Sequence, residues 1–378
     1  MRRSWFRTVL FQIHLWGGLI LGIYAFLIGL TGSVLVFHEE LAEQIAPEPR
    51  RAETGRAASL DEIRARINAA FPDWHVFSLQ PPKEPGRPWT SYLLRAGKGR
   101  LIFADSQGNV TGERNLTGTW LQLVEQFHSN LLIRGGRLYN GVAGLLVAVL
   151  AVTGAVLWWP RRGEWASAFR IVRRANWKGI TYDLHRVGGA LTFAFAVLFC
   201  ITGAYFTWPA VYRQIIGAVL PVSPRPGPTA RIQAGLARRP LDALVASAQR
   251  RVPEGILLRV LMPQSATQPV RIVFRHGRPD ENRKTSHIAV NPYTGEVTGA
   301  DMYAEQRTGD HLVSMLSPLH TGHFGGLPVK LIWALAGLAM PALFVTGFVM
   351  WWNRVLVPRA RRRTSREPVE ARIEAISR

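Results

Sequence analysis

The chain has 378 residues, of which 48% are hydrophobic, and its formal net charge is +21. A charge of this size can indicate nucleic-acid binding, but most of the basic excess lies beside long apolar runs, which argues against a nucleic-acid partner. The single cysteine, Cys200, lies inside such a run, so an intrachain disulfide is excluded and a thiolate metal site is not expected. This composition is typical of a membrane protein with water-soluble parts.

Four apolar runs are long enough to cross a bilayer, because a hydrocarbon core about 30 Å thick needs roughly 20 helical residues. The runs cover approximately residues 11–37, 138–160, 187–209 and 329–352. The first run is longer than a signal-peptide core, and no small-residue cleavage site follows Phe37. We therefore expect an uncleaved first helix and a lipid bilayer as the chain's surroundings.

The distribution of basic residues predicts the orientation in the membrane. The N-terminus has three arginines, the short loop 161–182 has six basic residues and the tail after Trp352 has eight, against four acidic residues in all three segments. The insert 38–137 has 13 basic and 12 acidic residues. By the positive-inside rule, both termini are expected in the cytoplasm and the two long inserts outside.

These observations predict eight segments. In chain order, we expect a cytoplasmic N-terminus with the first span (1–37), an external domain (38–118), an interfacial helix with the second span (119–160), a basic cytoplasmic loop (161–182), the third span (183–209), a second external domain (210–310), an interfacial segment with the fourth span (311–352) and a basic cytoplasmic tail (353–378).

The two halves of the chain repeat one plan. The runs beginning at His14 and His185 each continue with a Gly-Gly pair, and each has a Thr-Gly pair 17 residues after the histidine. Each half then returns to the membrane through a passage that contains a histidine, His128 in the first half and His320 in the second. The repeat predicts a membrane α-helical protein in which four transmembrane helices form a bundle from two parallel repeats.

Each insert has the pattern of a small α+β domain. In the first insert, Ser59 and Glu62 have the spacing of a helical capping box, and short alternating apolar runs follow from Trp74 onwards. The second insert has a helical stretch from Pro240 to Arg251 and then strands at 256–261, 270–274 and 287–290. The inserts end in the similar sequences GNVTG and GEVTG.

The paired histidines are the candidate site. A lone histidine in a membrane is usually a hydrogen-bond partner between helices, but the repeat places His14 with His185 at the cytoplasmic end and His128 with His320 at the external end. Two imidazoles facing each other suit the axial positions of a haem iron, and the neighbouring glycines either leave room for the macrocycle or allow close helix packing. Zinc fits less well, because no carboxylate or thiolate joins the histidines at ligand spacing.

Two further histidines remain as substitute ligands. His323 lies three residues after His320, and His38 stands at the external end of the first span beside two glutamates. No C-x-x-C-H sequence is present, so any haem is expected to bind non-covalently.

The chain resembles the PepSY-associated transmembrane helix family over approximately residues 5–355. The resemblance rests on HLWGGL, FHSNLL, DLHRVGG and PLHTGHFGG, on the repeated Thr-Gly pairs and on the two PepSY-like inserts. It implies a bacterial inner-membrane protein similar to di-haem ferric-siderophore reductases, with two haem b groups held by His14, His185, His128 and His320. The substrate would be a ferric siderophore or another ferric chelate, reduced at the periplasmic face.

The chain departs from some relatives of this family, which carry a flavin- or nicotinamide-binding portion. It has no G-x-G-x-x-G strand-turn-helix, so the electrons would come from membrane quinol or from a separate cytoplasmic flavoprotein reductase. Two other functions stay open at this point. One is a non-catalytic PepSY sensor or regulator that binds a peptide or protease, and the other is a metal or haem uptake protein.

Overall fold

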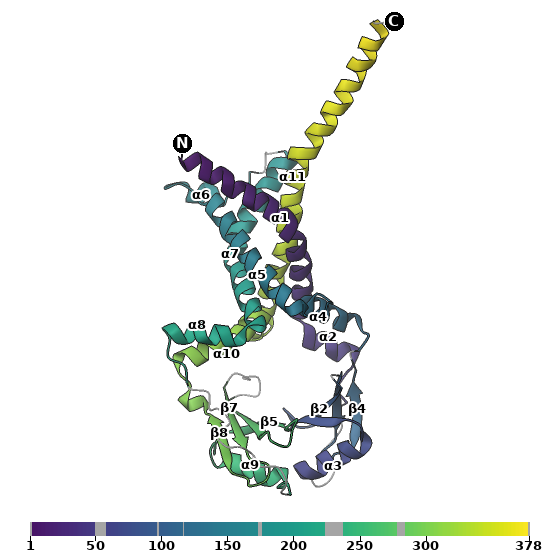
Figure 1. The fold of residues 1–378 in the computed structure, drawn as a ribbon, viewed down its shortest axis with the longest axis vertical. Coiled ribbons are helices and arrows are strands. Elements are labelled where there is room, and N and C mark those ends of the chain that lie inside the picture. Colours follow the sequence, from purple (N-terminus) through teal and green to yellow (C-terminus); the bar gives the residue numbers. More distant parts are fainter. Residues whose placement is uncertain are drawn as a thin grey trace. The chain divides into compact units, whose positions relative to one another are not determined.

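The computed structural model describes residues 2–49, 58–96, 98–115, 117–172, 176–223, 237–277 and 284–376. The chain divides into two compact units (Figure 1). The helical unit comprises Met1–His38, Trp120–Pro209 and Leu316–Arg378, and the sheet unit comprises Glu39–Thr119 and Ala210–Met315. Each unit is described by itself.

Four long helices form the helical unit. They are α1 (Arg2–Leu35), α5 (Gly136–Trp158), α7 (Trp177–Thr207) and α11 (Gly326–Ile376). Each contains a stretch that is long and apolar enough to cross a membrane: Trp5–Leu35, Gly136–Trp158, Trp177–Thr207 and Gly326–Val355. Large apolar side chains on their outer faces are exposed, as expected for helices whose solvent is lipid. The chain is a multi-pass membrane protein with four candidate spans, as the sequence predicts.

The packing of these helices repeats between the two halves. Helix α1 contacts α5 and α11, and α7 contacts the same two helices, so that α1 and α7 occupy equivalent places. The approach of α1 to α11 is close at Gly29, where an added Cβ would lie 2.7 Å from the carbonyl oxygen of Gly337. The hydroxyl of Ser33 also donates across this interface to the carbonyl of Ala334 (2.9 Å). Small residues therefore allow these two helices to pack closely, as is common in membranes.

Short helices flank the spans. The passages predicted to be interfacial are helical in α4 (Trp120–Asn130) and α10 (Thr308–Thr321). Three further short helices were not predicted: α2 (His38–Ile45), α6 (Trp165–Ala168) and α8 (Pro209–Val219). Helix α2 begins with Glu39 and Glu40, which stabilise a helix N-terminus, and α8 begins with a proline, which suits the first position of a helix. Such short elements carry little periodic signal in sequence.

The sheet unit is built on one antiparallel sheet of eight strands in the order β4-β3-β2-β1-β5-β6-β7-β8. The strands are β1 (His75–Gln80), β2 (Trp89–Arg95), β3 (Lys98–Ala104), β4 (Val110–Arg114), β5 (Ile256–Leu261), β6 (Val270–Arg275), β7 (Thr285–Val290) and β8 (Val297–Asp301), and a 3-10 turn, η1 (Tyr303–Glu305), follows. From their sequences the two inserts are expected as separate domains, whereas β1 pairs with β5 through Ser78–Leu261 and Leu79–Val260. This pairing covers two edges that separate sheets would expose.

Helices α3 (Leu60–Ala70) and α9 (Leu241–Gln249) pack on this sheet and share its core, to which both inserts contribute. The predicted capping box is present, because the Ser59 hydroxyl accepts from the backbone N–H of Glu62 and the Glu62 carboxylate accepts from that of Ser59. The two helices also cap each other. Asp61 accepts from the N–H of Leu241 (2.6 Å), and Asp242 accepts from that of Leu60 (3.2 Å).

Candidate functional site

The four predicted site histidines lie in the helical unit, and each contacts a Thr-Gly pair on a neighbouring helix. His14 on α1 places its Nδ1 3.0 Å from the Thr153 hydroxyl and 3.3 Å from the Leu150 carbonyl. His185 on α7 repeats the arrangement on α11, with its Nδ1 3.0 Å from both the Thr346 hydroxyl and the Leu343 carbonyl. In both cases the carbonyl belongs to the residue three positions before the threonine.

The other two histidines have the same surroundings. His128 on α4 places its Nδ1 3.0 Å from the Thr31 hydroxyl of α1 and also bonds to the Ile28 carbonyl. His320 on α10 lies 3.1 Å from the Thr202 hydroxyl of α7 and bonds to the Phe199 carbonyl. One arrangement of hydroxyl, carbonyl and imidazole therefore occurs four times.

These contacts determine which ring nitrogen carries the proton. A carbonyl oxygen only accepts, so an Nδ1 that bonds to one must donate. Each threonine hydroxyl is within donating distance of a carbonyl one turn earlier in its own helix, at 2.6–2.8 Å, and is then an acceptor toward the histidine. The neutral imidazoles are consequently protonated at Nδ1. Their Nε2 lone pairs are left available for a metal ion, as is typical of metal-binding histidines.

The glycine after each threonine makes room for the imidazole. An added Cβ would lie 2.8 Å from the His14 ring at Gly154, 2.9 Å from His128 at Gly32, 3.0 Å from His320 at Gly203 and 3.1 Å from His185 at Gly347. Contacts this short require the ring to move. The Thr-Gly pairs, which in the sequence only mark the repeat, thus both orient the histidine and accommodate its ring.

The histidines form two pairs. The ring centroids of His14 and His185 are 6.3 Å apart, and those of His128 and His320 are 6.2 Å apart. A metal ion lies about 2 Å from an imidazole nitrogen, and the ring adds roughly 1 Å to its centroid, so two imidazoles on opposite sides of one ion have centroids about 6 Å apart. Both separations therefore fit an ion held between two rings.

Each pair offers two imidazole ligands, which favours a metal ion that is already bound to other ligands. Among the residues that the structure describes, no group of three or more His, Cys, Asp or Glu side chains could hold a metal ion. Two imidazoles alone do not complete a tetrahedral zinc site, but they do complete the axial positions of a macrocycle-bound iron.

The Gly-Gly pairs have space beside them. An added Cβ at Gly18 would meet no atom within 4 Å, and at Gly188 or Gly189 it would lie an ordinary 3.7 Å from Leu343. Only Gly17 approaches a neighbour more closely, at 3.3 Å from Leu150. Close helix packing therefore does not explain three of these four glycines, and the alternative, room for a bulky group, fits them better.

The two substitute ligands lie in different surroundings. His38 places its Nε2 3.6 Å from the carboxylate of Glu125 on α4. The interaction with His38 is the main cause that lowers the pKa of Glu125. His323 follows the end of α10 and is exposed. Neither has the Thr-Gly surroundings that the paired histidines share.

Two tryptophans beside the His14–His185 pair have unusual indole groups. Trp158 and Trp351 are five residues after Thr153 and Thr346, and each is followed by a second tryptophan. In the structure only the second member of each pair is strongly exposed, at 62% for Trp159 and 48% for Trp352. The Nε1 atoms of Trp158 and Trp351 are buried and have no hydrogen-bond partner among the described residues.

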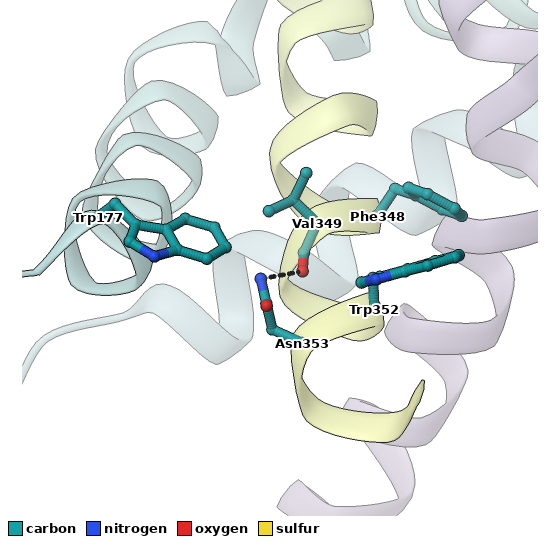
Figure 2. A pocket seen from close by; sticks show the side chains of 5 residues that line it. All are labelled: Trp177, Phe348, Val349, Trp352 and Asn353. Atoms are coloured by element: carbon teal, nitrogen blue, oxygen red, sulfur yellow. Dashed lines mark hydrogen bonds between the residues drawn. The ribbon is translucent and has the colours of Figure 1, made fainter. Parts of the chain in front are cut away.

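A pocket of about 440 Å³ lies between α7 and α11, at the end of these helices where the His14–His185 pair lies. Trp177 of α7 and Phe348, Val349, Trp352 and Asn353 of α11 line it, and Figure 2 shows Trp177 reaching toward α11. The Asn353 side-chain amide donates to the Val349 carbonyl (2.8 Å). Val349 is three residues after Thr346, which contacts His185, so the pocket begins about one helical turn from that contact.

Comparison with protein families gives one match, to the family described as the PepSY-associated TM region, over residues 11–354. No curated protein matches the chain.

Proposed function

The chain belongs to the PepSY-associated TM region family, and from this membership and its paired histidines we propose that it is an electron-transfer protein containing two haem b groups. It reduces ferric iron held by a chelator such as a siderophore, at the periplasmic face of a bacterial inner membrane. The observation that supports this most strongly is the fourfold arrangement of Thr, Gly and His, which presents two pairs of free imidazole nitrogens.

A bound haem supplies an iron that gains and loses one electron at a time. The chain's own residues would position it. His14 and His185 would hold one group, and His128 and His320 the other. The threonine hydroxyls keep each ring in one tautomer and orientation, and such supporting hydrogen bonds also tune the basicity of a ligand. Because the histidine pairs lie among the spans, water is excluded from a group held there, and a change in the charge of that group costs more free energy.

The direction of transfer rests on the positive-inside rule. It assigns the ends of the spans near His14 and His185 to the cytoplasm. By chain connectivity, the inserts that form the sheet unit then leave the membrane on the periplasmic side, where α4 and α10 lead into the following spans. Electrons would enter at the His14–His185 pair and leave from the His128–His320 pair. A ferric chelate takes up one electron there and becomes a ferrous chelate, which hard oxygen ligands hold less tightly.

The pocket beside His185 favours a quinol as electron donor. A quinol is planar and apolar and reaches the protein from the lipid, and aromatic and apolar side chains line most of the pocket. The amide oxygen of Asn353 can accept a hydrogen bond from a quinol hydroxyl. Oxidation of one quinol to a quinone releases two protons and two electrons, enough for two ferric ions. The alternative donor is a cytoplasmic flavoprotein that docks on the basic loop 161–182.

The first experiment is an absorbance spectrum of the purified protein with and without dithionite. We expect the Soret and alpha bands of a low-spin haem, with two haems per chain. Replacing His14 or His185 by Ala should remove one haem, replacing His128 or His320 the other, and His323→Ala serves as the exposed control. A spectrum without these bands, together with indifference to histidine loss, would support the sensor or regulator function instead.

The second experiment tests the reaction. The haems are reduced anaerobically, either by dithionite or by a short-chain quinol, and a membrane-impermeant ferric chelate is then added outside oriented vesicles. We expect haem reoxidation that is faster than with the iron-free chelator. Equal rates, or reoxidation only from the cytoplasmic side, would exclude ferric reduction even if both haems are present.

A further inference from the structure

The indole N–H groups of Trp158 and Trp351 are equivalent in the two halves of the chain. Both are buried, and neither has a hydrogen-bond partner among the described residues. Leaving a buried donor unpaired costs about 1–3 kcal/mol, so an N–H in this condition usually has a partner that protein atoms do not supply. The same unpaired donor at the same place in both repeats points to one shared partner.

The positions of these tryptophans indicate where that partner lies. Trp158 is four residues after Gly154, and Trp351 is four residues after Gly347. Residues four apart share a helix face, and the two glycines are on the faces that receive the His14 and His185 rings. Each indole therefore lies on the histidine-facing side of its helix, about 6 Å further along the axis.

A third buried donor lies next to His185 in the sequence. The guanidinium of Arg186, next to His185, bonds to the Asp183 carboxylate (3.0 Å) and to the Arg170 carbonyl (2.9 Å). Its Nε is nevertheless buried without a partner among the described residues. Buried donors without a described acceptor thus occur on α5, α7 and α11, the helices that carry or contact these histidines, which favours a partner that accepts hydrogen bonds and carries negative charge.

We infer that Trp158 and Trp351 donate hydrogen bonds to the carboxylates of the group held between His14 and His185. This inference rests on the proposed function, and for a haem the carboxylates are its two propionates. Tryptophan is a donor only, so it can pair with a carboxylate without adding charge inside the membrane. Hydrogen bonds to the propionates disperse their negative charge, which favours the reduced iron and raises the midpoint potential of this haem.

Among the residues that the structure describes, the His128–His320 pair has no unpaired donors at the equivalent positions. The positions four residues after Gly32 and Gly203 are Val36, which is apolar, and Thr207, whose hydroxyl already donates to the Arg137 carbonyl (3.0 Å). The two haems therefore differ in a defined way, and the loss of the indole donors should affect only the haem at His14 and His185.

The test compares Trp158→Phe, Trp351→Phe and the double variant with Trp159→Phe and Trp5→Phe. Phenylalanine keeps an aromatic ring and removes the N–H, and the two control tryptophans are strongly exposed and lie outside the pocket lining. Midpoint potentials are measured by anaerobic spectroelectrochemical titration, and haem release is measured by transfer to apomyoglobin. The two haems are assigned with the His14→Ala and His128→Ala variants.

We expect the haem at His14 and His185 to show a lower midpoint potential and a several-fold faster release in both single variants. The effect should be largest in the double variant and absent from the controls and from the other haem. If the variants behave like the controls while both haems are bound, the N–H groups donate elsewhere, such as to the ring of Phe169 beside Trp158, and the inference is wrong. Absence of haem from the unsubstituted protein would instead contradict the proposed function.

Discussion

Each paired histidine is oriented by a hydroxyl and a carbonyl from one turn of a neighbouring helix. The hydroxyl matters because an imidazole that loses it can rotate or protonate on the other nitrogen. Replacing Thr153 or Thr346 by Val keeps the shape and removes this contact. Since loss of a residue that supports a metal-binding histidine typically costs 10–100-fold in affinity, we expect a comparable loss of haem affinity at the His14–His185 pair.

Haem titration of the washed protein measures this effect. Thr181→Val is the matched control, because the Thr181 hydroxyl donates to the Trp177 carbonyl of its own helix and contacts none of the four histidines. Equal affinity in the control and in Thr153→Val would show that the hydroxyl does not orient the ring.

The glycines that receive the rings allow a graded test. At Gly154 an added Cβ would lie 2.8 Å from the His14 ring, at Gly347 it would lie 3.1 Å from the His185 ring, and at Gly144 its nearest contact would be 3.8 Å. We expect Gly154→Ala to displace haem most, Gly347→Ala less and Gly144→Ala not at all. Alanine favours a helix over glycine by about 1 kcal/mol, so the loss cannot come from a weaker helix.

Haem content per chain and the thermal midpoint of each variant measure this order. Full haem content in Gly154→Ala would mean that the ring adapts without losing its ligand geometry.

At the scale of the elements, Asp310 connects the start of α10 to α8. Its carboxylate accepts from the Arg213 guanidinium (2.6 Å) and from the backbone N–H groups of Ser223 (2.8 Å) and Arg307 (3.1 Å). Burial by itself raises the pKa of Asp310, but the hydrogen bonds from Ser223, Arg307 and Arg213 overcome it and lower the pKa to about 2. The folded state therefore favours the charged carboxylate.

This shift predicts the pH at which the connection weakens. The pKa is lower in the folded than in the unfolded chain, so the stabilisation is complete above about pH 4 and is lost as the pH falls toward 2. Asp310→Asn should abolish this pH dependence. It should also destabilise the sheet unit by about 1–3 kcal/mol near pH 7, because it removes the charged partner of the half-buried Arg213 guanidinium, which keeps its hydrogen bond to the Ser223 carbonyl. Thermal midpoints between pH 7 and pH 2.5 test both effects, with the exposed Asp73→Asn as control.

The elements also show what could be predicted from sequence. The spans, α3 and most strands have clear periodic patterns, and the structure confirms them. The pairing of β1 with β5 was not predictable, because it joins two edges more than 180 residues apart without a turn signal. The short α2 and α8 were missed for lack of a long pattern.

In the candidate site, the histidine positions followed from the duplication, and their role as ligands stays a prediction. The role of the Thr-Gly pairs was missed because it depends on contacts between helices. The Thr-Gly pair occurs four times in the sequence, and this repetition was the signal that could have indicated its role.

At the scale of the whole molecule, the duplication governs both units. In the helical unit, α1 and α7 each carry a histidine at one end and a Thr-Gly pair at the other, so each helix takes part in both histidine pairs. In the sheet unit, Asp61 and Asp242 exchange helix caps across the two halves. Neither half of the chain contains all the elements of the helical unit or of the sheet unit. The halves expressed separately should therefore not form either histidine pair.

The interval of 17 residues between His14 and Thr31 has an electrical consequence. At 1.5 Å per residue it spans about 25 Å of α1, close to the thickness of the hydrocarbon core. An electron that passes from one histidine pair to the other therefore crosses most of the membrane voltage, which is worth about 2.3 kcal/mol per 100 mV for a unit charge. A potential that is negative inside drives a negative charge outward. In proteoliposomes with a reductant inside, reduction of an external ferric chelate should accelerate when a potassium diffusion potential of this sign is imposed and slow when its sign is reversed.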